Sequence, residues 1–135
     1  MKHLNLIASV ACAAAMAIGA VAGYAQAGPR PPALASPPTP NGAALYLSRC
    51  GGCHSIATNR VGPAHRGVVG RRAGSQPGFS YSAALRGSNI TWTPQALDQW
   101  LRGPQVMVRG SRMFTSVPNP TERAAIIAYL RTQTN

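Results

Sequence analysis

Two cysteines and a histidine, Cys50, Cys53 and His54, fall within the five-residue stretch CGGCH at residues 50–54. A redox dithiol of the thioredoxin kind needs a preceding strand and a βαβ surround, whereas a helical pattern precedes Cys50. A tetrahedral zinc site needs four ligands, and after residue 27 only His65 is left to complete one. In the third chemistry both thiols add to the vinyl groups of haem and the adjacent histidine binds the iron. Cys-x-x-Cys-His is the signature of that attachment, so the residues favour haem.

The first 27 residues have the layout of a secretory signal peptide. A positive start at residues 1–3 precedes an uncharged apolar run at 4–23 and the small-x-small sequence Ala25-Gln26-Ala27. About 20 apolar residues could also anchor the chain in a membrane, but this run is mostly alanine and glycine. We therefore expect cleavage after Ala27, which leaves Cys50 and Cys53 as the remaining cysteines. A disulfide between them would close a tiny loop and stabilise little.

The chain is strongly basic, with a net charge of +11 from thirteen basic and two acidic residues. Such a balance can indicate nucleic acid, an anionic membrane or an acidic protein as partner. The arginines are dispersed and accompany no basic helix or aromatic RNA-binding pattern, and their number also fits a GC-rich genome. We therefore expect no nucleic-acid binding and retain an acidic protein surface as the partner.

The folded part is predicted to be all-α, with four short helices separated by loops. The predicted helices and their caps are residues 42–50 after Asn41, a short helix capped by Ser80 and ended by Gly87, residues 94–102 after Thr93, and residues 120–132 after Asn119. Pro94 and Pro120 suit the first helical position, Glu122 suits a capping box, and Gly103-Pro104 is interpreted as a stop. No stretch alternates as a strand should.

Three segments follow from this pattern: a signal peptide at 1–27, a proline-rich arm or linker at 28–41, and a single domain at 42–135. The glycine-rich stretch 62–78 is predicted to be a long loop. Long loops in a compact domain usually have a function or surround a component that the chain itself does not supply. Four short helices also bury little apolar surface. A large apolar cofactor would supply the missing core.

The order of these features resembles the class I c-type cytochromes, the small one-haem electron carriers of mitochondria and bacteria. The resemblance covers residues 42–133 and includes Gly42 and Tyr46 before the CGGCH stretch and Tyr129 in the last helix. The segments VGPAHRGVVGRRAGSQPGFSYSAAL and ITWTPQALDQWLRGP follow in the family's order. The resemblance implies the cytochrome c fold, in which the first and last helices cross at Gly42, Tyr46 and Tyr129.

The resemblance also implies a set of cofactor residues. His54 would bind iron while its other ring N–H donates to the Pro63 carbonyl. Met113 would be the sixth ligand in preference to Met107, and a His/Met pair raises the reduction potential. Donors to the haem propionates would satisfy carboxylates that are costly to bury. The cofactor-binding residues are then Cys50, Cys53, His54, Pro63, Arg71, Tyr81, Trp92, Ser111 and Met113, with Arg71, Tyr81 and Trp92 as propionate donors and His54 and Met113 as metal ligands.

Three positions depart from the family pattern. His65 stands where leucine is usual, and we expect its ring to turn outward, although it could bond nearby or compete for iron when a ligand is lost. Arg109 stands where proline is usual, which predicts a looser loop around Met113. Thr115 replaces an aromatic residue, with Phe114 beside it.

The function that the resemblance implies is a periplasmic one-electron carrier with one covalent haem c and its iron, and not an enzyme. We expect a monomer without a small-molecule substrate, which shuttles electrons between membrane or soluble redox partners that have acidic docking surfaces. The arginines expected near the haem edge are Arg66, Arg102, Arg109 and Arg112. An alternative is a dedicated haem c subunit of a periplasmic dehydrogenase, tethered by the proline-rich arm. A haem sensor or peroxidase would need an open sixth position.

Overall fold

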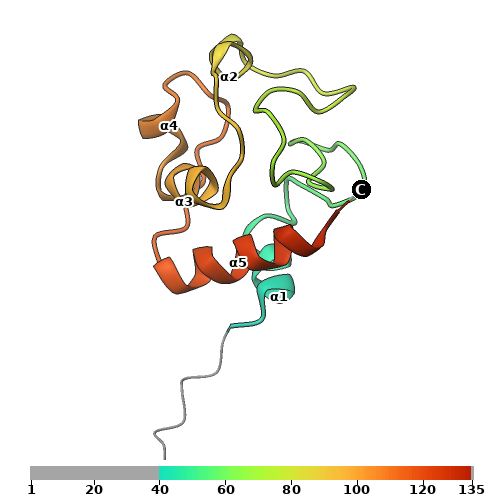
Figure 1. Cartoon of the computed structure of the whole chain (residues 1–135), viewed down its shortest axis with the longest axis vertical. Helices are drawn as coiled ribbons and strands as arrows, with labels where there is room; N and C mark the ends of the chain where they lie inside the picture. The colour runs from blue at the N-terminus through green and yellow to red at the C-terminus, as the bar shows by residue number, and fades with distance from the viewer. Residues whose placement is uncertain (1–39, 135) are drawn as a thin grey trace, which may run out of the picture. The chain divides into compact units, whose positions relative to one another are not determined.

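The computed structural model describes residues 40–134, so the predicted signal peptide and nearly all of the arm lie outside the described residues. Five helices make up the regular structure of this part of the chain (Figure 1): α1 Gly42–Arg49, α2 Ala83–Gly87, α3 Pro94–Arg102, α4 Pro104–Met107 and α5 Pro120–Thr132. Its β-structure is limited to an isolated bridge between Arg72 and Thr91. The all-α prediction is confirmed. None of the helices within residues 40–134 combines the length and the apolar character that a membrane-spanning segment needs.

Helices α1, α3 and α5 begin at the caps that the sequence predicts. The side chains of Asn41, Thr93 and Asn119 each accept a hydrogen bond from a backbone N–H of the first turn. These N–H groups have no partner inside the helix, so a short polar side chain just before it satisfies them. Local chemistry therefore sets where these helices start.

Two helix predictions need correction. Helix α2 begins later than expected, because Ser82 rather than Ser80 accepts from the backbone N–H of Leu85 at 3.2 Å. The sequence does not predict helix α4, because Gly103-Pro104 is typical of a helix end. Gly103 is extended, and Pro104 then occupies the first position of a new short helix, a place that proline favours.

Helices α1 and α5 pack directly against each other, and α5 lies across α1 in Figure 1. A Cβ atom at Gly42 would lie 2.2 Å from the carbonyl oxygen of Ala125, so glycine allows the two backbones to approach. The rings of Tyr46 and Tyr129 pack beside this point with their centroids 5.4 Å apart. The predicted crossing of the first and last helices is therefore present.

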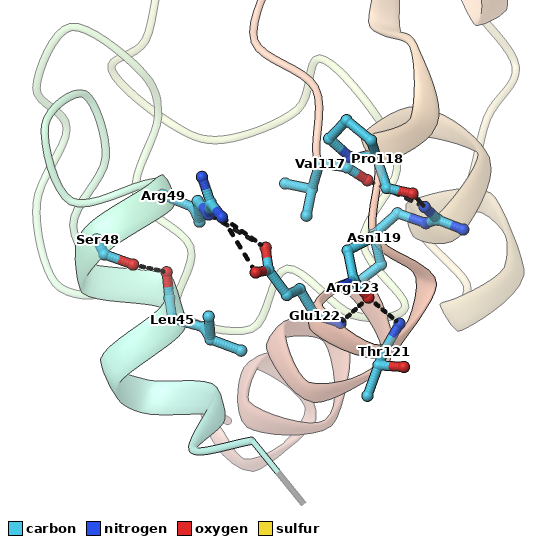
Figure 2. A network of polar contacts seen from close by, with 9 residues as sticks. All are labelled: Leu45, Ser48, Arg49, Val117, Pro118, Asn119, Thr121, Glu122 and Arg123. Carbon is cyan, nitrogen blue, oxygen red and sulfur yellow. Dashed lines mark hydrogen bonds and ion pairs between the residues drawn. The ribbon is translucent and has the colours of Figure 1, made fainter.

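An ion pair also links these helices. Figure 2 shows Arg49 donating to both carboxylate oxygens of Glu122, at 3.0 and 3.1 Å. The expected capping box is thus only half formed: Asn119 accepts from the start of α5, as Figure 2 also shows, while the carboxylate of Glu122 faces Arg49.

A buried arginine connects α3 to α5. Arg123 is 5% exposed, and its guanidinium donates to Asp98 at 2.7 Å and to the carbonyls of Val117 and Pro118 at 3.0 and 2.6 Å. Asp98 also accepts from Arg102 at 2.6 Å. Hydrogen bonding to Arg123 lowers the pKa of Asp98 below its usual value. The pair fixes the chain between Met113 and α5.

Replacing Asp98 with alanine is expected to lower the free energy of unfolding by about 3 kcal/mol, because it leaves a buried guanidinium without its counter-charge. Denaturant unfolding of the intact haem protein measures this. The matched control is Glu122→Ala, which removes an ion pair whose arginine is 52% exposed and should cost less than about 1 kcal/mol. Equal losses in the two variants would contradict the role assigned to Asp98.

The same pair predicts a pH dependence. Because the pKa of Asp98 is lowered in the folded protein, its contribution is present above the unfolded value of about 3.9 and is lost as the pH falls through the folded pKa. The difference in free energy of unfolding between the wild type and Asp98→Ala, measured by denaturant unfolding, should therefore become smaller at acidic pH.

Candidate cofactor site

The helices surround a cavity of about 330 Å³. Its walls include Leu97 and Leu101 of α3 and Ile126 and Leu130 of α5, all of which belong to the hydrophobic core. Sites that take small molecules and cofactors have volumes of about 300–1,000 Å³ and mostly apolar linings. The core of this protein is thus built around a space suited to an apolar ligand.

Cys50, Cys53 and His54 lie together at this cavity. The chain turns sharply where α1 ends, and the backbone N–H groups of Cys53 and His54 both donate to the Cys50 carbonyl, at 3.0 and 2.9 Å. Both cysteines are free thiols. The turn therefore presents two thiols and an imidazole to one space.

The other two interpretations of these cysteines find no support in the described residues. Burial raises the pKa of Cys50 to about 11, whereas reactive dithiols have lowered thiol pKa values. Within residues 40–134, no group of three or more His, Cys, Asp or Glu side chains is placed to hold a metal ion. A zinc site of four such ligands is therefore absent from this part of the chain.

His54 has the geometry of a histidine prepared to bind a metal. Its Nδ1 lies 2.9 Å from the Pro63 carbonyl oxygen. A carbonyl can only accept, so Nδ1 carries the hydrogen and Nε2 keeps a free lone pair. Burial lowers the pKa of His54, partly offset by the bond to Pro63, so the ring is neutral near pH 7. A neutral imidazole fixed by its second nitrogen is the usual form of a metal-binding histidine.

Met113 lines the same cavity, whereas Met107 lines a separate pocket formed by residues of α3 and α4. The indole N–H of Trp100 donates to the sulfur of Met113 at 3.2 Å. A thioether sulfur has two lone pairs, so this bond leaves one for a metal. Trp100 was not among the residues predicted for the site. The sequence around Trp100 does not indicate this role, because the contact joins α3 to the separate segment that carries Met113.

Arg71, Tyr81 and Trp92 also line the cavity together. Tyr81 and Trp92 are each 7% exposed, and burial raises the pKa of Tyr81, so its hydroxyl remains a donor. The guanidinium of Arg71 donates to the carbonyls of Ala64 and Arg66, both at 2.9 Å, and to the side chain of Gln76. Three side chains that can donate hydrogen bonds therefore line one cavity. Ser111 lines the cavity as well and is buried.

The comparisons with known proteins agree with this geometry. The Cytochrome c family model matches residues 40–134. The chain belongs to the cytochrome c family. It is 44% identical over 91 residues to a cytochrome c2 of Rhodomicrobium vannielii, covering 64% of this chain and 73% of the relative, and 44% identical over 91 residues to one of Rhodopila globiformis, covering 65% and 86%. Cytochrome cH of Methylobacterium extorquens superimposes with a TM-score of 0.65 at 39% identity, covering 68% of this chain and 95% of that structure.

As a member of the cytochrome c family, the protein carries one covalent haem c with its iron and serves electron transport. The residues present fit that group: the walls of an apolar cavity hold two thiols, a neutral histidine, a methionine sulfur, the buried donors Tyr81 and Trp92 and the half-buried Arg71. Each residue predicted for the site lines this cavity, including Pro63 and Ser111.

His65, one of the departures from the family pattern, does not turn outward as expected. Its Nδ1 lies 3.2 Å from the Tyr46 hydroxyl, and its ring stacks on His54 with centroids 4.1 Å apart and planes 21° apart. Burial, and next the proximity of His54, lower the pKa of His65 to about 3, so the ring is neutral. Tyr46 supplies a polar partner at the helix crossing, which is why an imidazole is accommodated inside.

The four arginines expected near the haem edge differ in their positions relative to the cavity. Of Arg66, Arg102, Arg109 and Arg112, only Arg112 lines the cavity, and Arg102 is paired with Asp98. Arg49, which was not predicted here, lines the cavity from the end of α1. Exposed apolar side chains stand beside these charges: Val61 and Phe114 line the cavity and are each 79% exposed. The mouth of the cavity thus combines positive charge with apolar surface.

Proposed function

We propose that this protein is a periplasmic one-electron carrier in which His54 and Met113 ligate the haem iron and Cys50 and Cys53 hold the haem covalently. The observation that carries the proposal is the convergence on one cavity of a histidine and a methionine sulfur, each with a hydrogen bond that leaves a lone pair free. The bound haem supplies the reversible one-electron chemistry of iron. Two protein ligands would leave no position for a substrate, so we propose a carrier and not an enzyme.

The chain's own residues would set the conditions for this chemistry. Pro63 orients His54, Trp100 orients the sulfur of Met113, and the apolar walls keep water away. Arg71, Tyr81 and Trp92 would donate to the haem carboxylates, which a buried site must satisfy. Export to the periplasm rests on the signal-like layout of residues 1–27. We propose that the protein acts as a monomer.

The partners of this carrier are proposed to be redox proteins with acidic docking surfaces. Both acidic side chains of the described chain, Asp98 and Glu122, are already paired with arginines. The remaining exposed arginines therefore give the surface a positive field, which attracts negative partners over a Debye length of about 10 Å at 0.1 M salt and about 3 Å at 1 M. Arginine can also pair with carboxylates through two hydrogen bonds.

The rate of electron transfer with a small redox reagent is therefore expected to depend on salt concentration, in a direction set by the sign of the reagent's charge. The second-order rate with ferricyanide, an anion, should fall steeply as ionic strength rises, and the rate with a cationic cobalt tris-phenanthroline complex should rise. Stopped-flow absorption of the haem measures both. Arg112→Glu, at the mouth of the cavity, should slow the anion more than Arg131→Glu, on α5 away from it. Rates that do not depend on salt, or equal effects of the two substitutions, would contradict docking near Arg112.

A further inference from the structure

Gln105 of α4 is bonded to the segment that carries Met113. Its Nε2 donates to the Ser111 carbonyl and hydroxyl oxygens, both at 2.8 Å, and to the Met113 carbonyl at 2.9 Å. Its Oε1 accepts from the backbone N–H of Gly110 at 3.3 Å. We propose that Gln105 is a positioning residue that holds the methionine loop, residues 109–116, in the conformation in which Met113 binds iron. This inference rests on the proposed ligation by Met113.

Besides its bonds to Gln105 and Trp100, the loop has few restraints, namely the bonds from the Arg112 guanidinium to the Ser80 carbonyl at 3.2 Å and from the Ser111 N–H to the Val108 carbonyl at 3.1 Å. It contains no helix, and Arg109, Gly110 and residues 114–116 are exposed. Gly110 has a positive φ of 85°, a conformation with a low cost for glycine alone. The sequence predicts a looser loop because Arg109 replaces a proline. The bonds of Gln105 would restrain the loop where this proline is absent, and the looser loop stays a prediction from the sequence.

The contacts hold Met113 at two points. Trp100 bonds its sulfur, and Gln105 bonds its carbonyl oxygen. Ser111, a predicted cofactor-binding residue, is 3% exposed, and its hydroxyl also faces Gln105. Side-chain amides commonly satisfy backbone groups that lack secondary structure, and a lost partner leaves those groups unsatisfied when they are buried. One side chain therefore restrains the backbone on both sides of Arg112.

The consequence is a change in how readily Met113 leaves the iron. An added ligand such as imidazole binds ferric iron only when Met113 has dissociated, so its apparent affinity rises with the population of the dissociated state. Without Gln105 that population should rise. The apparent affinity for imidazole then reports on the contact even when the protein stays folded.

The test uses the ferric haem protein and two variants. Gln105→Ala removes every bond, while Gln105→Glu keeps the size and the acceptor for Gly110 but places a carboxylate against three oxygens. Both should bind imidazole about tenfold more tightly than the wild type or better, since several hydrogen bonds are lost. The control Gln99→Ala, on the exposed side of α3, should stay within about twofold. If Gln105 only filled space, Gln105→Glu would bind imidazole as the wild type does.

A second measurement follows the loop without reference to the iron. Trypsin cleaves after arginine, and Arg109 and Arg112 both lie in the methionine loop. Cleavage at these sites, followed by mass spectrometry, should be faster in both Gln105 variants than in Gln99→Ala. Unchanged cleavage and unchanged imidazole affinity would overturn the role of Gln105. A wild-type protein without a sulfur-to-iron absorption band would instead refute ligation by Met113, and faster cleavage in the variants would then show a loop contact with no effect on the ligand.

Discussion

Replacing Met113 with alanine is expected to abolish the weak far-red band that a sulfur-to-iron bond gives the ferric protein, and to lower the reduction potential. A thioether favours ferrous iron more than an imidazole does, so losing it stabilises the ferric state. For a one-electron couple, each tenfold loss in the preference for ferrous over ferric iron lowers the reduction potential by about 59 mV. We expect a decrease of at least this size. Absorption spectra and a potentiometric titration of the same sample measure the two effects.

Met107→Ala is the matched control for this substitution. Met107 lies in the separate pocket with Gln99 and Val106 and does not line the cavity that holds Cys50, His54 and Met113. Its removal should leave the band and the potential unchanged. A protein in which Met107→Ala removes the band while Met113→Ala keeps it would show that the ligand is assigned to the wrong methionine.

The structure also predicts what does not replace Met113. His65 could compete for iron on sequence grounds, but it stacks on His54 and bonds to Tyr46, so it lies beside the expected ligand and not across the cavity from it. Met113→Ala and the double variant with His65→Ala should therefore have the same spectrum. A low-spin bis-imidazole spectrum that only the double variant lacks would show that His65 moves to the iron.

The parts of the fold that the sequence predicts correctly are those with local causes. Asn41, Thr93 and Asn119 cap their helices through bonds to N–H groups two or three residues away, so the pattern is complete within a few positions. Cys50 and His54 likewise share one turn of chain. Helix α4 was missed because four residues carry almost no periodicity, and Gly103-Pro104 fits both an end and a beginning.

The errors concern side chains whose partners are distant in sequence. His65 was expected to turn outward, yet Tyr46, nineteen residues earlier, gives it an inward partner. Glu122 fits a capping box, but Arg49 is brought to it by the crossing of α1 and α5. Trp100 and Gln105 act on the methionine loop only after α3 and α4 have folded. Such contacts depend on packing, which composition and spacing do not specify.

Gly62 offers the second large effect, because it lies against the ring of His54. A Cβ atom at Gly62 would lie 2.2 Å from Cε1, 2.5 Å from Nδ1 and 2.6 Å from Nε2 of His54, far closer than van der Waals contact allows. The ring is held by the Pro63 carbonyl at 2.9 Å and is stacked on His65. The backbone at Gly62 is also bonded, donating to Cys53 and accepting from Arg60, each at 2.8 Å. Neither the ring of His54 nor the backbone at Gly62 can move freely. Glycine is therefore required here because a side chain would collide with the ring, and not because of the backbone conformation.

Gly62→Ala is therefore expected to displace His54 and weaken its bond to iron. Overpacking of this kind typically costs about 1–3 kcal/mol, and here the strain falls on a metal ligand. We expect a lower yield of protein with attached haem, a lower free energy of unfolding, and tighter binding of imidazole to the iron. The control Gly52→Ala lies in the same CGGCH stretch, where an added Cβ would meet nothing within 4 Å, and should behave as the wild type. If the two variants matched in haem content, unfolding and imidazole affinity, the ring of His54 would be free to move and Gly62 would not hold the ligand in place.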